Sequence, residues 1–303
     1  MKRVLLVGLL LYLSLTAQDT PPASIHLELG KNILALAEPT TLAVEITNLM
    51  DGDLLLDNLY MFQLHDSPYH LSLFLITPDG KQWFCTGSRY NVEIMHGPDT
   101  KFYLFLPAGN TISRVMPLWW TTFLPYKYQI ALETLTPGTY KLFANYQLPD
   151  QNGLKNVTVY SDTLEFVFLP LNEKHLSVLI EMDSLYLSYI TLVGSEIYQP
   201  LERIRDSRTP YSEDAHVRLI LGWSRNYELF TAKKVGFDEL YWESPYQVVL
   251  MTRQAGLAKR AGLDTQVDSL LEILSNRYPT HSAVLKYHNK VRLLTAREAR
   301  SAK

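Results

Sequence analysis

Two clusters of aromatic side chains are the residues of this sequence best suited to binding a ligand. The first includes Trp119, Trp120 and Tyr126 and lies between two strand-like stretches, in a segment without clean alternation. The second is Tyr241 and Trp242, in the stretch DELYWES between two helix-like stretches. Exposed flat rings can stack on a glycan or a peptide, whereas buried rings would cover a joint within the fold. Both interpretations stay open for these five candidate ligand-binding residues.

Catalytic residues are less well supported. Glu239 and Glu243 flank the second cluster and could form an acid–base pair beside a sugar-stacking ring. Two carboxylates four residues apart are, however, common on any exposed helix. The sequence has neither a Gly-x-Ser-x-Gly nucleophile motif nor a glycine-rich phosphate loop. It therefore predicts no catalytic residue and favours a non-enzymatic function.

The sequence predicts neither a metal site nor a cofactor. No two of the eight histidines have the i, i+4 spacing of a helical zinc site, and Cys85 is the one cysteine. Asp51 and Asp53 could offer oxygens to calcium, but their order differs from that of an EF-hand loop and a polar hairpin explains them. Cys85 is expected to be a small buried residue of a strand, and the histidines are expected at the surface.

The first 18 residues predict export. Lys2 and Arg3 precede an apolar run from Val4 to Leu15, which is too short to span a bilayer easily and is typical of a signal peptide over residues 1–18. An uncleaved N-terminal anchor is the alternative. No later run approaches spanning length, so we expect a periplasmic or extracellular protein with no integral membrane segment after signal removal.

The region from Ser24 to about Pro170 has the apolar period of strands. Leu42, Val44 and Ile46 alternate with their neighbours, and Pro-Asp-Gly at 78–80 is typical of a turn. Short strands with repeated turn signals and no helical period favour an antiparallel β-sandwich over residues 19–170.

One segment of this region, LTPGTYKLFANYQL, places Tyr140 two residues after Gly138 at the start of a strand. The pattern resembles the tyrosine corner of immunoglobulin-like domains, in which the hydroxyl binds backbone groups at a corner of the sandwich. Leu142 stands where antibody domains carry their second cysteine. The resemblance, over about residues 24–170, is therefore to bacterial exported immunoglobulin-like modules.

After Pro170 the apolar period changes to about 3.6, which predicts an all-α domain over residues 171–303. Asn172 and Ser212 are expected helix caps, Ser244 to Gln247 an expected capping box, and Gly262 a helix end. A last helix is expected from about His281, with a buried face made of Val284, Tyr287, Val291 and Leu294.

The end of this region, including GLDTQVDSLLEILSNRYPTHSAV, resembles a tetratricopeptide-type helical hairpin over about residues 244–300. The Trp/Leu/Gly signature of that repeat's first helix is missing. One repeat does not bury its own apolar face, so the resemblance implies that these helices stack on the preceding ones. The expected fold class is an immunoglobulin-like sandwich followed by a tetratricopeptide-like all-α domain.

Composition limits the partners. Lys and Arg total 28 against 31 Asp and Glu, a net charge of −3, which gives no global electrostatic reason to expect nucleic acid. From Lys286 onward there are six basic residues and one acidic residue, Glu298. This basic end could contact an acidic partner or anionic lipid, or could simply complement a helix dipole.

These observations predict an exported, non-enzymatic binding or scaffold protein. Its sandwich and helical groove would contact a protein or peptide partner. The alternative is a secreted carbohydrate-binding or carbohydrate-active protein that uses the two aromatic clusters on a glycan. A purely structural role, in which the sandwich spaces the helices from a surface, is also open.

Overall fold

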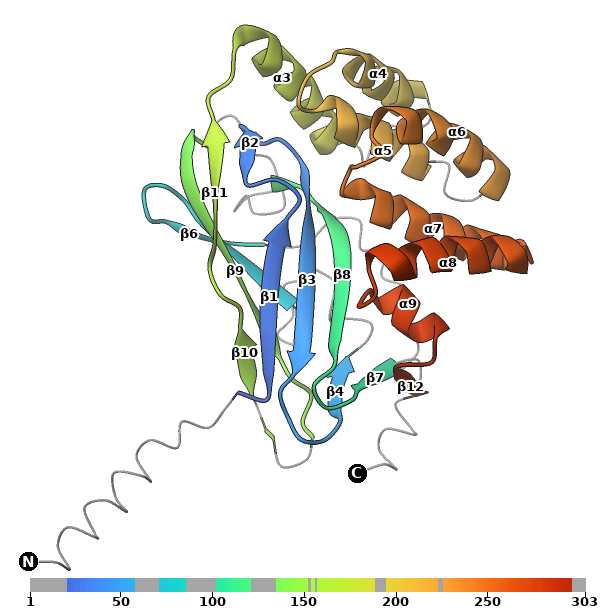
Figure 1. The fold of residues 1–303 in the computed structure, drawn as a ribbon. Helices are drawn as coiled ribbons and strands as arrows, with labels where there is room; N and C mark the ends of the chain where they lie inside the picture. The colour runs from blue at the N-terminus through green and yellow to red at the C-terminus, as the bar shows by residue number, and fades with distance from the viewer. Residues whose placement is uncertain are drawn as a thin grey trace, which may run out of the picture.

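A computed structural model describes residues 21–57, 71–85, 102–120, 135–151, 154–155, 157–188, 195–222 and 226–295 (Figure 1). The expected signal peptide, residues 1–18, and Tyr126 lie outside the described residues. Strands form the first part of the chain, and helices follow from Glu173 onward.

The first sheet contains three antiparallel strands in the order β1-β3-β8 (Figure 1). They are β1 (Ala23–Leu29), β3 (Thr40–Asn48) and β8 (Thr111–Leu118). The predicted strand around Val44 is confirmed, and Leu42, Val44 and Ile46 are fully buried. Alternation buries one side of each strand, because successive side chains point to opposite faces.

The second sheet is mixed. Its order is β2 (Ile33–Ala35), β11 (Leu164–Leu169), β9 (Gly138–Gln147), β5 (Leu71–Ile76) and β6 (Gln82–Phe84), and β10 (Thr158–Tyr160) also pairs with β9. The β2–β11 pair is parallel and the others are antiparallel. Tyr140 makes the predicted corner contact: its hydroxyl donates to Thr136 O at 2.9 Å and accepts from Thr136 N at 3.0 Å.

A third small sheet joins distant parts of the chain. It contains β4 (Leu54–Asp57), β7 (Phe102–Leu106) and β12 (Arg292–Thr295), with β7 in the middle. The predicted last helix is therefore wrong beyond Tyr287. Asn289 adopts a left-handed φ of 52°, and Lys290 N donates to Leu285 O at 2.9 Å, which ends the helix as a glycine would. The chain then continues as β12.

Seven helices follow the strands in the described residues. They are α3 (Glu173–Ser188), α4 (Ser195–Asp206), α5 (Ser212–Gly222), α6 (Tyr227–Leu240), α7 (Tyr246–Arg260), α8 (Asp264–Arg277) and α9 (Ser282–Tyr287). None of them is long and apolar enough to cross a membrane.

The predicted helix ends are correct at several positions. The Asn172 side chain accepts from His175 N at 2.8 Å, and Gly262, with a φ of 71°, follows α7. The Ser244 hydroxyl accepts from Tyr246 N at 3.0 Å, but the capping box is not completed. The Gln247 side chain instead donates to Asp238 and to the Tyr241 carbonyl, because α6 packs beside it.

The expected fold class, an immunoglobulin-like sandwich followed by a separate tetratricopeptide-like all-α domain, is wrong. The sheets are small, one contains a parallel pair, and a strand from the end of the helical region completes the third. The largest hydrophobic cluster contains Leu42 and Phe166 from the sheets together with Leu179 and Ile204 from the helices. The period of the sequence specifies strands and helices but not which strands pair.

Candidate functional site

Trp120 is part of the core. Its side chain is 2% exposed, and its ring lies 4.8 Å from Phe166 and 5.1 Å from Phe168 between centroids. Its indole nitrogen donates to the Glu38 carbonyl at 2.7 Å. Both the ring of Trp120 and its N–H donor are therefore engaged in contacts within the protein.

The side chain of Trp119, directly after β8, contacts residues of α5. Its indole nitrogen donates to Asp214 Oδ1 at 3.1 Å, and the Arg218 guanidinium lies 4.2 Å above its ring. Asp214 also accepts from the Tyr246 hydroxyl at 3.2 Å and forms an ion pair with Arg218. Trp119 and Trp120 thus lie at the seam between sheets and helices, which is the alternative that the sequence left open.

The second aromatic cluster lies at the C-terminal end of α6. Tyr241 ends α6 and packs against Phe237 at 5.0 Å, and burial, with a contribution from Glu213, raises the pKa of its hydroxyl. Trp242 is 60% exposed, with the Arg277 guanidinium of α8 4.4 Å from its ring centre. Glu239 and Glu243, the candidate acid–base pair, are both exposed.

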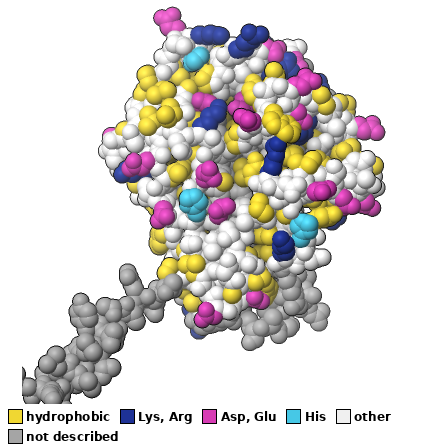
Figure 2. Space-filling model, viewed as in Figure 1, with side chains coloured by type: hydrophobic (Ala, Val, Ile, Leu, Met, Phe, Trp, Pro, Cys, Tyr) yellow, Lys and Arg dark blue, Asp and Glu magenta, His cyan; other side chains and the backbone are white. Residues whose placement is uncertain are grey.

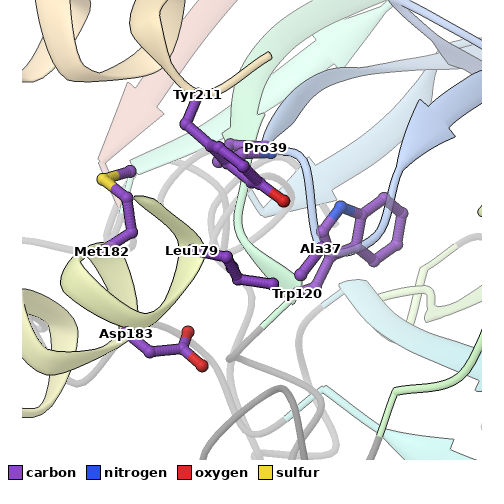
Figure 3. A pocket seen from close by; sticks show the side chains of 7 residues that line it. All are labelled: Ala37, Pro39, Trp120, Leu179, Met182, Asp183 and Tyr211. Atoms are coloured by element: carbon purple, nitrogen blue, oxygen red, sulfur yellow. The ribbon is translucent and has the colours of Figure 1, made fainter. Parts of the chain in front are cut away.

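A small cavity lies at the seam beside Trp120 (Figure 3). Leu179 and Met182 of α3 border it, and Tyr211 approaches from the segment before α5. Its volume is about 10 Å³, and a cavity of this size holds about one water molecule. The Tyr211 hydroxyl donates to the Leu36 carbonyl at 2.7 Å, and burial raises the pKa of this hydroxyl. The cavity is a feature of packing rather than a ligand site.

The larger hollow is a groove that we name the β8–α7–α9 groove. Its volume is about 560 Å³, within the range of small-molecule and peptide sites. Its described lining consists of residues 114–117 of β8, Leu221 at the end of α5, Val249, Thr252, Arg253 and Gly256 of α7, and residues 281–283 and Lys286 at α9. These elements are contiguous because α7 and α9 both pack against β8 (Figure 1).

The groove is cationic. Arg114, Arg253 and Lys286 contribute to its lining, whereas no Asp or Glu does so among its described residues. Burial, together with the positive charges of Arg114 and Lys286, lowers the pKa of His281 to about 4. Burial and Arg114 also lower the pKa of Lys286. The groove therefore carries a positive potential and a neutral histidine at pH 7.

The outer edge of β8 lies along this groove. Ser113 N donates to Thr280 O at 2.8 Å, so Ser113 directs its backbone donor away from β3. Directions alternate along an antiparallel strand, and Val115 therefore directs its backbone N–H and C=O to the same outer side. Val115 lines the groove, so this stretch of backbone faces it.

Two histidines contradict the expectation that histidines lie at the surface. His281 is 3% exposed, and its Nδ1 accepts from Ala283 N at 3.3 Å. His216 is buried against Phe237, and its Nδ1 has no hydrogen-bond partner among the described residues. Cys85 is buried, as predicted, directly after β6. In the part of the chain that the structure describes, no three His, Cys, Asp or Glu side chains lie together as a metal site requires.

Sequence reasoning missed the groove because its cations come from three separated segments. In the sequence, Lys286 is the first residue of a basic end, and Arg114 and Arg253 are isolated charges. The one local signal was Gly256 within an otherwise regular helix, since a glycine there is unfavourable and indicates open space or a close approach. A Cβ at Gly256 would meet no atom within 4 Å.

Comparisons with known proteins identify no family. The chain matches no protein-family model and no curated protein. Among solved structures, it aligns with the alkylpurine DNA glycosylase AlkC of Pseudomonas fluorescens bound to DNA, at 10% identity over 49% of this chain and 30% of that one, with a TM-score of 0.26. It also aligns with the sporulation control protein Spo0M of Bacillus subtilis, at 13% identity over 55% and 56%, with a TM-score of 0.25.

A β-glucosidase from Listeria innocua in complex with glucose aligns at 14% identity, with a TM-score of 0.25, over 48% of this chain and 16% of that one. The chain spans less than two thirds of the length of these three structures. At such TM-scores the similarities carry no inference about this chain, so its function must be argued from its own residues.

Proposed function

We propose that this chain is an exported, non-enzymatic binding protein that holds an extended segment of a partner protein in the β8–α7–α9 groove. The observation that carries this proposal is a groove of about 560 Å³ that combines the outer edge of β8 with apolar and cationic side chains. A strand edge offers main-chain hydrogen bonds to an extended peptide, and neighbouring pockets select its side chains. Pro117 lacks an N–H, which limits pairing to a short segment.

Gly256 allows a direct test of groove binding. Peptides are selected from a random display library on the protein, and their dissociation constants are measured on the wild type and on Gly256→Trp. Because a Cβ at position 256 enters open space beside α7, we expect the indole to occupy the groove without displacing the fold. We expect at least a tenfold loss of affinity, about 1.4 kcal/mol.

The matched control is Gly52→Trp, at an exposed bend between β3 and β4 where an added Cβ also meets nothing within 4 Å. It should bind the selected peptides as the wild type does. Equal binding by Gly256→Trp and Gly52→Trp would show that the peptides bind elsewhere, and the proposal would fail.

Export is supported by the charged start and the apolar run of residues 1–18. The full chain is expressed in a bacterial host, and the N-terminus of the mature product is sequenced. A product that begins at Gln18 or Asp19 agrees with removal of the signal peptide. A product that retains Met1 contradicts it.

Carbohydrate binding is the second candidate, and the exposed ring of Trp242 favours it. One side of this ring is near Arg277, so a sugar would stack on the other. A glycan array is probed with the wild type and Trp242→Ala. Signals that are lost in the variant support this candidate, and an array without signals excludes it.

A further inference from the structure

The groove differs in charge from the rest of the molecule. The whole chain has a small acidic excess, and acidic and basic side chains are interspersed over the face seen in Figure 2. The described groove lining instead contains three cationic side chains and no acidic one. Clustering of one charge in a hollow concentrates its field and attracts ligands of the opposite charge.

Lys286 is the most informative of these cations. It is partly buried, and no carboxylate among the described residues forms an ion pair with it. Its pKa is lowered by burial and by Arg114, so the surroundings of Lys286 disfavour its charged form. An anion seated beside Lys286 would remove this penalty and gain a charge-assisted hydrogen bond.

Two further residues with polar side chains line the same space. The Thr252 hydroxyl oxygen is buried and has no hydrogen-bond partner among the described residues. The Nδ1 of His281 accepts from Ala283 N, so in the neutral ring the proton resides on Nε2, which can act as a donor. A buried hydroxyl without a partner is costly, and rotation of the Thr252 side chain toward the groove would allow a ligand oxygen to satisfy it.

The remaining lining favours a peptide over a small inorganic anion. Val115, Met116 and Val249 provide apolar contacts that a phosphate or sulfate ion could not use. Val115 also directs backbone groups to this side of β8. A chain with alternate apolar and acidic side chains would match both features, since successive side chains of a strand point in opposite directions.

We propose that the β8–α7–α9 groove binds an acidic extended peptide, which places an Asp or Glu carboxylate against Lys286 and within reach of Arg114 and Thr252. This inference rests on the proposed function and adds the chemical class of the bound segment. Charge attraction selects the peptide, and its apolar side chains contact Val115 and Val249.

The test uses two fluorescent peptide libraries of eight residues, with Val or Leu at alternate positions and either Glu or Gln at the others. Binding to the wild type is measured by fluorescence anisotropy at low and high salt. We expect the Glu library to bind at least about tenfold more tightly than the Gln library, and to weaken as salt rises. Gly256→Trp should weaken both libraries.

Lys286→Gln isolates the proposed contact. It should weaken the Glu library about five- to tenfold and leave the Gln library unchanged, because a neutral amide loses only the charge-assisted part of the interaction. The control is Lys290→Gln, which removes the same charge from an exposed position outside the described groove lining. Thermal unfolding verifies that both variants are folded.

The outcomes separate this inference from the proposed function. One outcome is that the Glu and Gln libraries bind equally, that Gly256→Trp blocks both and that Lys286→Gln affects neither. This outcome would overturn the acidic preference but would still support peptide binding in the groove. Equal losses in Lys286→Gln and Lys290→Gln would also overturn the assigned contact. Failure of both libraries to bind would overturn the acidic class, and failure of the display selection would overturn the groove itself.

Discussion

At the scale of single residues, the buried side chain of His281 makes the stability of this protein depend on pH. His281 lies at the start of α9 beside β8 and forms an isolated β-bridge with Ser113. Its pKa is about 4 in the folded protein, against 6.5 for the free side chain, because it is buried and lies near Arg114 and Lys286. The folded state therefore binds this proton less readily than the unfolded state does.

We predict a loss of stability between pH 6.5 and pH 4 that depends on His281. The contribution of the neutral ring is fully present above pH 6.5 and is lost as the pH falls to about 4, with a total on the order of 3 kcal/mol at most. Urea unfolding is measured from pH 7.5 downward on the wild type and on His281→Asn, which retains a capping acceptor. The variant should have a flatter profile, and His216, whose pKa is also lowered by burial, contributes to the slope that remains. Parallel profiles would contradict the prediction.

At the scale of elements, α7 contains a position where its stability can be raised. Gly256 lies inside this helix at an exposed site with no atom within 4 Å of an added Cβ. Alanine restricts the unfolded chain more than glycine does. Gly256→Ala should therefore raise the free energy of unfolding by about 0.5 to 1 kcal/mol.

Gly222, the last residue of α5, is the matched control for Gly256. A Cβ there would lie 2.9 Å from Cε1 of Tyr198, so Gly222→Ala should destabilise the protein. Both variants are compared with the wild type by urea unfolding. A lower midpoint for Gly256→Ala would show that α7 requires its glycine for another reason.

The elements also show what could be read from the sequence. The strand around Val44 and the helix end at Gly262 were predictable, because local period and glycine conformation are encoded within a few residues. The parallel pairing of β2 with β11 was not predictable from the sequence. The strand β12 was not predictable either, since a run such as Leu293-Leu294 suits either a helix or a strand. The groove was not predictable either, because β8 and α9 are distant in the sequence and no local motif records their contact.

At the scale of the whole molecule, sheets and helices share one large core. Asp214, at the start of α5, joins Trp119 after β8, Tyr246 at the start of α7 and Arg218. Its side chain is 2% exposed. Removal of the Asp214 carboxylate takes this acceptor away from the guanidinium of Arg218, the indole N–H of Trp119 and the hydroxyl of Tyr246.

Asp214→Ala should lower the free energy of unfolding by about 3 kcal/mol or more. Because the largest hydrophobic cluster joins residues of the sheets and the helices, the helical signal in circular dichroism and the intrinsic tryptophan fluorescence should shift together. The control is Asp206→Ala, which breaks an exposed pair with Arg205 and should cost at most about 1 kcal/mol. Two separate transitions in urea would contradict a shared core.

The position of β12 has a consequence during synthesis. Its partner β7 is made about 190 residues earlier, and the register joins Leu293 to Leu104. A ribosome must therefore extend the chain past Thr295 before β7 acquires its second neighbour, and any product interrupted before Arg292 keeps that backbone edge open. Such truncated products present the unpaired edge of β7 to proteases and chaperones, whereas β12 covers this edge in the folded chain.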